Sequence, residues 1–291
     1  MKRYIYFLTI NLFMLVFMMS CEGKKVNFSS THIGGCILRT SSGQPPDDIY
    51  SMSEIVITDE YQPFTKKITV CGITLIGRED ISDDFMKNVA ETIKEMFSPN
   101  GEQIDKSLQK KLITNMYKYR TVIPLFQGEN YEFSSSNEKK WDRTMRNNSI
   151  CDIIMEGVPG QVTEVVEHIL HFVTAIGMHY TFPNEWGISK NSELYFQMNQ
   201  AIDNGFYDIR QYDEIDKDED RLRVLLQEYA YWIIYTAWDF RVPYGPKNAE
   251  WSIMKKSELI DKLPNSYNLY KEYVTKVFNP PGKARLETFI D

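Results

Sequence analysis

The chain has 291 residues, with 33 Lys and Arg against 40 Asp and Glu, a formal net charge of −7 and 43% apolar residues. This length and apolar content can bury one sizeable core or two small ones, which excludes a disordered chain, a collagen-like chain and a small disulfide scaffold. Basic residues gather in no more than doublets such as Lys66-Lys67. No nucleic-acid partner is therefore expected.

Residues 1–20 have the order of a secretory signal peptide, with two basic residues, an apolar run over residues 7–19 and a small residue before Cys21. Met18-Met19-Ser20-Cys21 resembles the lipobox of bacterial lipoproteins, with Met18 where Leu is usual. The resemblance implies cleavage before Cys21, acylation of that cysteine (palmitate among the acyl chains) and anchoring to a membrane. An uncleaved single-span anchor and an ordinary signal peptide are the alternatives.

The expected location is the cell envelope, with the protein facing the periplasm or the cell surface. By the same resemblance, Glu22 directly after the cysteine is consistent with sorting to an outer membrane. In an oxidising envelope a disulfide can form among Cys36, Cys71 and Cys151, and Cys36 with Cys71 is one possible pair. The sequence leaves the connectivity open.

Residues 21–50 are rich in Ser, Gly and Pro and are predicted to form a tether with a solvated His32. A single domain is then expected over 51–291, because no linker or repeat divides it. β-Branched runs predict strands and apolar residues at helical spacing predict helices. The front half is assigned strands over 53–58, 67–76 (interrupted by Gly72), 122–126 and 150–155, helices over 82–98 and 103–119, and a polar loop over 134–148.

After Pro159-Gly160 the pattern is helical almost throughout. Helices are predicted over 161–178, 192–202, 220–240 and 264–277. The fold class is therefore α+β, with a small sheet and flanking helices in the front half and a helical back half.

The predicted helix 161–178 carries an unusual polar stripe. Glu164, Glu167, His168 and His171 fall within about 100° of the helical wheel, and nearly every other position is apolar. Imidazole and carboxylate groups one turn apart are ligands that zinc takes from a helix, so a divalent-metal site is predicted. An ordinary solvent face and a buried set of neutralising Glu-His pairs are the alternatives.

The stripe resembles the site helix of zincin metallopeptidases in two registers. Glu167-His168-Ile169-Leu170-His171 is similar to a scrambled His-Glu-x-x-His motif, which implies that Glu167 and His171 are ligands. Residues 164–168 are similar to the inverted His-x-x-Glu-His motif, which implies that Glu164 and His168 are ligands and Glu167 is the general base. The second register is slightly favoured, with His171 as an extra ligand. Residues 167–187 with 228–232 are also similar to a group of secreted bacterial proteins, from which no activity follows.

The resemblance implies a third ligand on a later helix. Glu228 is the only acid or base other than tyrosines between Val224 and Trp238, and a carboxylate in such apolar surroundings needs a partner such as a metal. Tyr231 lies on the same face and is a candidate donor to a developing oxyanion, although packing is the more ordinary role. His179 is either a further ligand or a turn residue.

Two functions follow from this pattern. The first is an envelope-anchored, zinc-dependent hydrolase that cleaves peptide bonds of a peptide or protein substrate, with Glu167 activating a metal-bound water. The second is a surface lipoprotein that binds metal or docks partners without catalysis.

Overall fold

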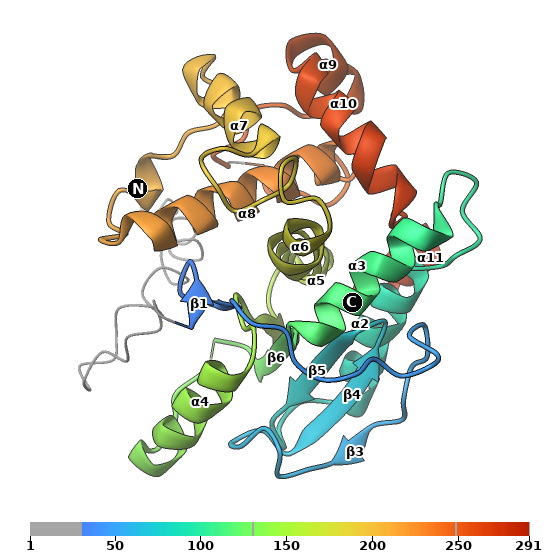
Figure 1. Ribbon diagram of the computed structural model, residues 1–291, viewed down its shortest axis with the longest axis vertical. Coiled ribbons are helices and arrows are strands. Elements are labelled where there is room, and N and C mark those ends of the chain that lie inside the picture. The colour runs from blue at the N-terminus through green and yellow to red at the C-terminus, as the bar shows by residue number, and fades with distance from the viewer. Residues whose placement is uncertain (1–30, 130, 248, 291) are drawn as a thin grey trace.

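The computed structural model describes residues 31–129, 131–247 and 249–290. The predicted signal peptide and the predicted lipidation site at Cys21 lie outside these residues. The fold is α+β, as predicted, with a five-stranded sheet in the first half of the chain and helices after residue 160 (Figure 1). In the described part of the chain, no helix has both the length and the apolar character needed to cross a membrane.

The sheet has the order β3-β4-β5-β6-β7, in which the first two pairings are antiparallel and the last two are parallel. A two-residue turn joins β4 to β5, and its residues Cys71 and Gly72 have φ of 45° and 76°. Two such angles define the tight hairpin turn that suits strand twist. A Cβ at Gly72 would lie 2.3 Å from the Ile113 carbonyl oxygen, so the turn needs glycine there. The strands are β3 Val56–Ile57, β4 Lys66–Val70, β5 Ile73–Gly77, β6 Val122–Gln127 and β7 Ile154–Glu156.

Helices cover both faces of the sheet, because alternate strand residues enter two different cores. Leu75 and Leu125 face the main core, which includes α2 (Asp83–Met96) and α3 (Lys106–Lys118). Ser82 caps α2 as its sequence predicts, accepting a hydrogen bond from the Phe85 amide.

The opposite face carries a smaller core beneath α4 (Ser135–Asn147), where Trp141 packs on Phe64 and Phe126 lies alongside. The prediction of a loop over 134–148 is therefore wrong. Only Trp141 and Thr144 of α4 are buried, so the apolar repeat is too short for the sequence pattern to reveal the helix.

The first described residues form a hairpin of β1 (His32–Ile33) and β2 (Ile37–Leu38). A disulfide joins Cys36 to Cys151, and Cys71 is a free, buried thiol, so Cys36 does not pair with Cys71. His32 is buried rather than solvated, and the Leu38 amide donates to the Ser149 hydroxyl. Residues 31–38 thus belong to the folded body, which corrects the tether prediction for this part of the segment.

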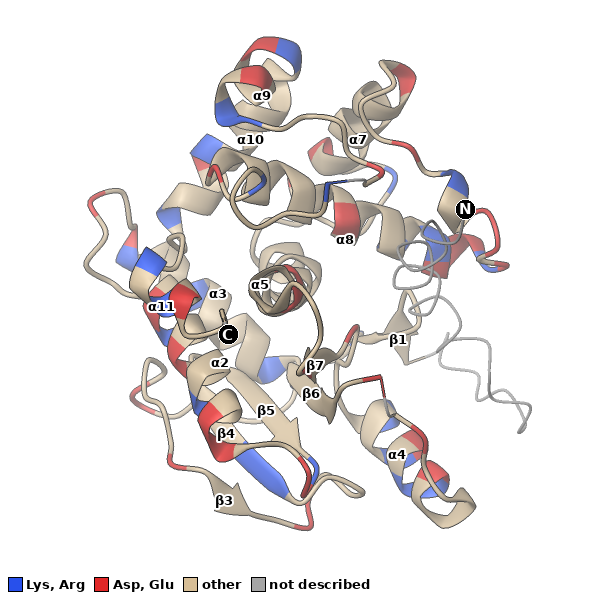
Figure 2. Cartoon of the chain, turned by 180° about the vertical axis from the view of Figure 1, so that it is seen from behind, with Lys and Arg blue, Asp and Glu red and all other residues tan. Residues whose placement is uncertain are grey.

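The site helix α5 (Gln161–Phe172) lies between the sheet and α8 (Asp218–Ala237) in both views of the molecule (Figures 1 and 2). The predicted helix 161–178 is α-helical only to residue 172 and continues as a π-helical turn, η1 (Val173–Met178). The remaining helical segments are α6 His179–Thr181, α7 Glu193–Asp203, η2 Arg210–Tyr212, α9 Lys256–Lys262, α10 Pro264–Tyr273, η3 Val274–Lys276 and α11 Lys283–Glu287.

Candidate metal centre

The start of α5 is fixed to the end of β7 by side chains of its first turn. Gly160 precedes the helix with φ of 77°, a conformation that favours glycine. Oε1 of Glu164 accepts a hydrogen bond from the Met155 amide at 2.8 Å, and Nε2 of Gln161 donates to the Met155 carbonyl. These bonds set the rotation of α5 about its axis, with Glu164 of the stripe against β7 and His171 beside Glu228 of α8.

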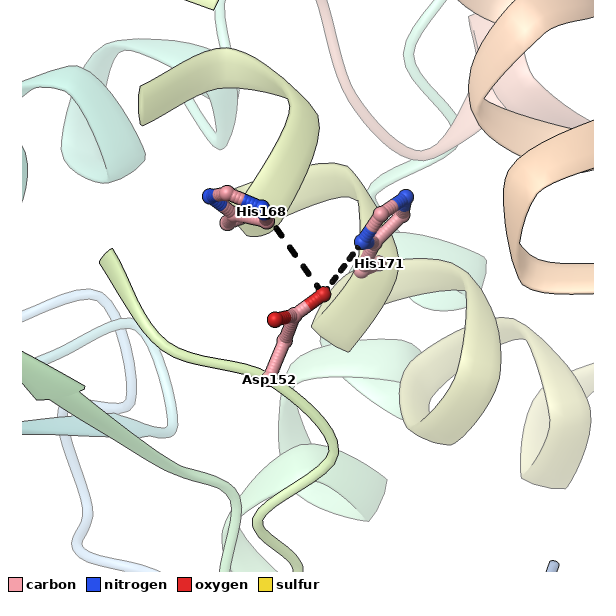
Figure 3. A group of neighbouring side chains, drawn as sticks. All are labelled: Asp152, His168 and His171. Atoms are coloured by element: carbon pink, nitrogen blue, oxygen red, sulfur yellow. Dashed lines mark hydrogen bonds and ion pairs between the residues drawn. The ribbon is translucent and has the colours of Figure 1, made fainter. Parts of the chain in front are cut away.

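Asp152 brings the two imidazoles of the stripe together (Figure 3). Its Oδ2 lies 2.7 Å from Nδ1 of His171 and 3.9 Å from Nε2 of His168. Nδ1 of His168 lies 3.1 Å from Oε1 of Glu164. Asp152, His168 and His171 form one of two groups in the described residues whose ligand atoms lie within 4.8 Å of one another.

The second group consists of Glu167, His171 and Glu228, and it joins α5 to α8. Nε2 of His171 lies 3.5 Å from Oε2 of Glu228. This nitrogen is buried and no hydrogen bond satisfies it. His171 therefore belongs to both groups, through Nδ1 in the first and Nε2 in the second.

The cluster is enclosed and rich in negative charge. The side chains of Asp152, Glu164, His168, His171 and Glu228 are between 0 and 12% exposed. Figure 2 shows acidic positions on α5 and in the middle of α8. Buried carboxylates are costly unless a cation or a proton neutralises them, so the excess of acids favours a bound cation.

The protonation of the cluster reflects the same excess. Burial and the nearby Glu228 charge raise the pKa of Glu167 to about 8. Burial alone would lower the pKa of His171, but the Glu228 charge and the hydrogen bond to Asp152 outweigh it and raise the pKa to about 9. The pKa of His168 is likewise raised, because Glu164 and Asp152 outweigh its burial. Bound protons thus offset part of the negative charge that a metal ion would otherwise neutralise.

The pKa of Asp152 is shifted downward, unlike those of Glu167, His168 and His171. Burial would raise the pKa of this carboxyl, but the neighbouring His168 charge and the hydrogen bond from His171 outweigh burial and hold the pKa below its usual value. Asp152 is thus a carboxylate between two imidazoles.

The four predicted ligands, Glu164, His168, His171 and Glu228, do not form a single group in the structure. His171 and Glu228 approach each other as a shared site requires. Glu164 and His168 contact each other, but the set Glu164, His168 and Glu228 is not one of the two groups within 4.8 Å. Glu167 is expected as the general base in the favoured register. It lies in one group with His171 and Glu228, which fits the ligand role that the other register gives it.

Tyr231 and His179 have different surroundings. The ring of Tyr231 packs edge-on against His171 at 5.8 Å, and its buried hydroxyl has no hydrogen-bond partner. Nδ1 of His179 accepts a hydrogen bond from the Ile188 amide, so this residue holds a turn outside both groups.

Two acidic residues near the cluster escaped the sequence analysis. Asp152 interrupts the apolar run 150–155, and that interruption is the same signal that drew attention to Glu228. Glu250 lies in a loop, where an acid is unremarkable, yet its Oε1 accepts a hydrogen bond from Nε1 of Trp232 at 2.7 Å. Burial and the Glu228 charge raise the pKa of Glu250.

Comparisons with known proteins found no relative of this chain. No protein-family model matches the chain, and neither the curated proteins nor the solved structures that were searched give a match. Buried His, Asp and Glu groups are arranged so that they can hold a metal ion.

Proposed function

We propose that this protein binds one divalent metal ion, zinc, with Glu167, His171 and Glu228 as ligands, and that metal binding is its function. The observation that carries the proposal is Nε2 of His171, which is buried, lacks a hydrogen bond and lies 3.5 Å from a Glu228 oxygen. Glu167 supplies a third ligand atom within 4.8 Å of the other two.

Zinc suits this donor set better than the harder cations do. Imidazole nitrogen with carboxylate oxygens is a combination that zinc takes at about 2.0–2.2 Å, whereas calcium and magnesium select sites of oxygen alone. The three side chains would have to move inward to reach these distances, because their donor atoms now lie up to 4.8 Å apart. A doubly charged ion also offsets the excess of buried carboxylates.

Elemental analysis of the purified full-length protein tests the proposal. Near-stoichiometric zinc is expected in the wild-type protein and in Glu138→Gln, which changes an exposed acid on α4. Glu228→Gln and His171→Ala should lose the metal. Wild-type protein that stays metal-free after incubation with zinc, or equal zinc in all four proteins, overturns the proposal.

Hydrolysis of peptide bonds is the second candidate. Three protein ligands leave a fourth position for water or substrate, as in catalytic zinc sites. The unpartnered hydroxyl of Tyr231, on the same helix as Glu228, is a donor available to that position. The substrate class, a peptide or protein, comes from the zincin resemblance alone.

The variant Glu167→Gln separates the two roles of Glu167. If Glu167 is a ligand, the variant loses zinc. If it is the general base of the favoured register, the variant keeps zinc and loses cleavage of a casein or peptide-library substrate. Parent-level zinc together with parent-level cleavage excludes both roles.

Anchoring in the cell envelope is part of the proposal. The lipobox-like residues 18–21 support acylation at Cys21, which places the metal centre on a lipoprotein facing the periplasm or the cell surface. Mass spectrometry of the membrane fraction should find acyl chains on the wild-type N-terminal peptide. Cys21→Ser should lack them and leave the membrane fraction.

A further inference from the structure

We infer that Asp152 is the positioning residue of this metal centre, fixing His171 so that Nε2 faces Glu228. This inference rests on the proposed function, in which Nε2 is the ligand atom. It assigns Asp152 a place outside the coordination sphere, and it assigns His168 no metal bond.

The first step is the hydrogen bond between Asp152 and His171. Oδ2 of Asp152 lies 2.7 Å from Nδ1 of His171. A carboxylate accepts hydrogen bonds, so Nδ1 carries the proton and Nε2 is the nitrogen left for a metal ion. A carboxylate behind a ligating imidazole fixes the orientation of the ring and raises its basicity.

The second step is the use of the Asp152 oxygens by protein donors. Oδ2 accepts from His171 and also from Nε2 of Gln227 at 3.3 Å. Oδ1 accepts from the Ile153 amide at 2.9 Å. A metal ion between Asp152 and His168 would have to displace the shortest of these bonds and bridge an oxygen-to-nitrogen distance of 3.9 Å.

The third step is the chain of contacts that holds Gln227. Nη1 of Arg223 donates to Oε1 of Gln227 at 2.9 Å, and its Nε donates to the Gly34 carbonyl at 3.0 Å. A Cβ at Gly34 would lie 2.5 Å from Cβ of Arg223, so the hairpin approaches α8 closely only because residue 34 is glycine.

The hairpin is also bonded covalently to the residue before Asp152, through the disulfide between Cys36 and Cys151. Asp152 is thus held from two sides, by the backbone at Cys151 and by the side chain of Gln227. Such restraint is what a positioning residue needs.

Metal titration of four variants of the full-length protein tests the inference. Zinc affinity is measured by competition with a chromophoric chelator, and cobalt(II) substitution reports ligand geometry through its visible absorption. Asp152→Ala should weaken zinc binding about 10–100-fold and shift the cobalt spectrum. Asp152→Asn should lose less, because its amide oxygen still accepts the Nδ1 proton. His168→Gln should bind zinc as the wild-type protein does, and Glu228→Gln should abolish binding.

Two results overturn the inference while leaving the proposed function intact. One is wild-type affinity and an unchanged cobalt spectrum in Asp152→Ala. The other is complete loss of binding in both Asp152→Ala and His168→Gln, which would make Asp152 a ligand. If Asp152→Ala fails to fold by circular dichroism, Asp152→Asn and Gln227→Ala carry the test, each with a partial loss of affinity expected and no loss overturning it. A wild-type protein without metal overturns the proposed function itself.

Discussion

The two polar-sided helices α4 and α5 cover very different interiors. Beneath α4, the ring of Phe64 packs in an apolar core against Phe126 and Trp141, with ring centroids 5.4 and 5.3 Å away. Between α5 and α8, the interior holds His171, Glu228 and other ionisable groups. The first interior is stabilised by burial alone, whereas the second is stable only if its charges are neutralised.

If the second interior holds the proposed metal ion, stability and metal binding should respond to substitutions in different interiors. Loss of a buried aromatic ring should change the free energy of unfolding and leave metal binding alone. Loss of a proposed ligand in the second interior, Glu167, His171 or Glu228, should change metal binding. Variants in the two interiors that changed the free energy of unfolding and metal binding to the same extent would contradict this distinction.

The largest expected effect is on the apolar interior. Phe64 is fully buried, so Phe64→Ala should lower the free energy of unfolding by about 3–5 kcal/mol through lost burial and the cavity that remains. Zinc per folded molecule should not change. Denaturant titration and elemental analysis measure the two quantities. Phe196→Ala, at a side chain that is 56% exposed, is the control and should lie within about 0.5 kcal/mol of wild type.

Removal of the disulfide should lower both the free energy of unfolding and the zinc affinity. Cys36→Ser with Cys151→Ser should destabilise the fold by about 2–5 kcal/mol, because the bond closes a loop with a sequence separation of 115. Zinc affinity should also fall, since Cys151 adjoins Asp152. Cys71→Ser leaves the disulfide in place and serves as the control for loss of a thiol. Unchanged affinity in the double variant would show that the hairpin stabilises the fold without supporting the site.

Zinc itself should stabilise only the protein that can bind it. At a free concentration of 100 times Kd, a ligand that binds only the folded state adds about 2.7 kcal/mol to the free energy of unfolding. Wild type should gain this amount and Glu228→Gln should not, as read from thermal melts with and without zinc. An equal gain in both proteins would mean that zinc binds elsewhere.

Much of the fold followed from short-range patterns. The β-branched runs predicted the strands, and Ser82 with its following apolar spacing predicted α2. Helix α4 could not be predicted in this way, because it buries only Trp141 and Thr144 and its remaining surface is polar. Trp141 packs on Phe64, which lies far away in the chain, so the local pattern does not reveal this contact.

The site was predictable only in part, for a similar reason. A helical wheel places Glu164, Glu167, His168 and His171 on one stripe, but it does not determine which of them meets Glu228. The contact of Glu164 with the Met155 amide fixes the rotation of α5, and that contact depends on tertiary structure. The interruption of the apolar run 150–155 distinguishes Asp152 in the sequence, but its place beside His171 depends on tertiary structure.

The smallest expected effect concerns Cys71, which lies in the main apolar core. Burial raises the pKa of this thiol from its ordinary 9.0 to about 12, so the folded state keeps the proton at pH values where the unfolded state loses it. The unfolded state then binds fewer protons, and stability falls as pH rises. The contribution is fully present below pH 9 and decreases by about 1.4 kcal/mol per pH unit between pH 9 and 12.

The measurement compares the free energies of unfolding of wild type and Cys71→Ser at pH 8 and pH 10. Subtracting the variant removes the contributions of the buried tyrosines, which both proteins share. The difference between the two proteins should shrink by about 1.4 kcal/mol over this interval. In native protein at pH 8 the thiol should also resist a disulfide reagent that reacts with it after unfolding. A difference that stays constant to pH 10, with rapid native labelling, would place Cys71 in contact with solvent and outside the apolar core.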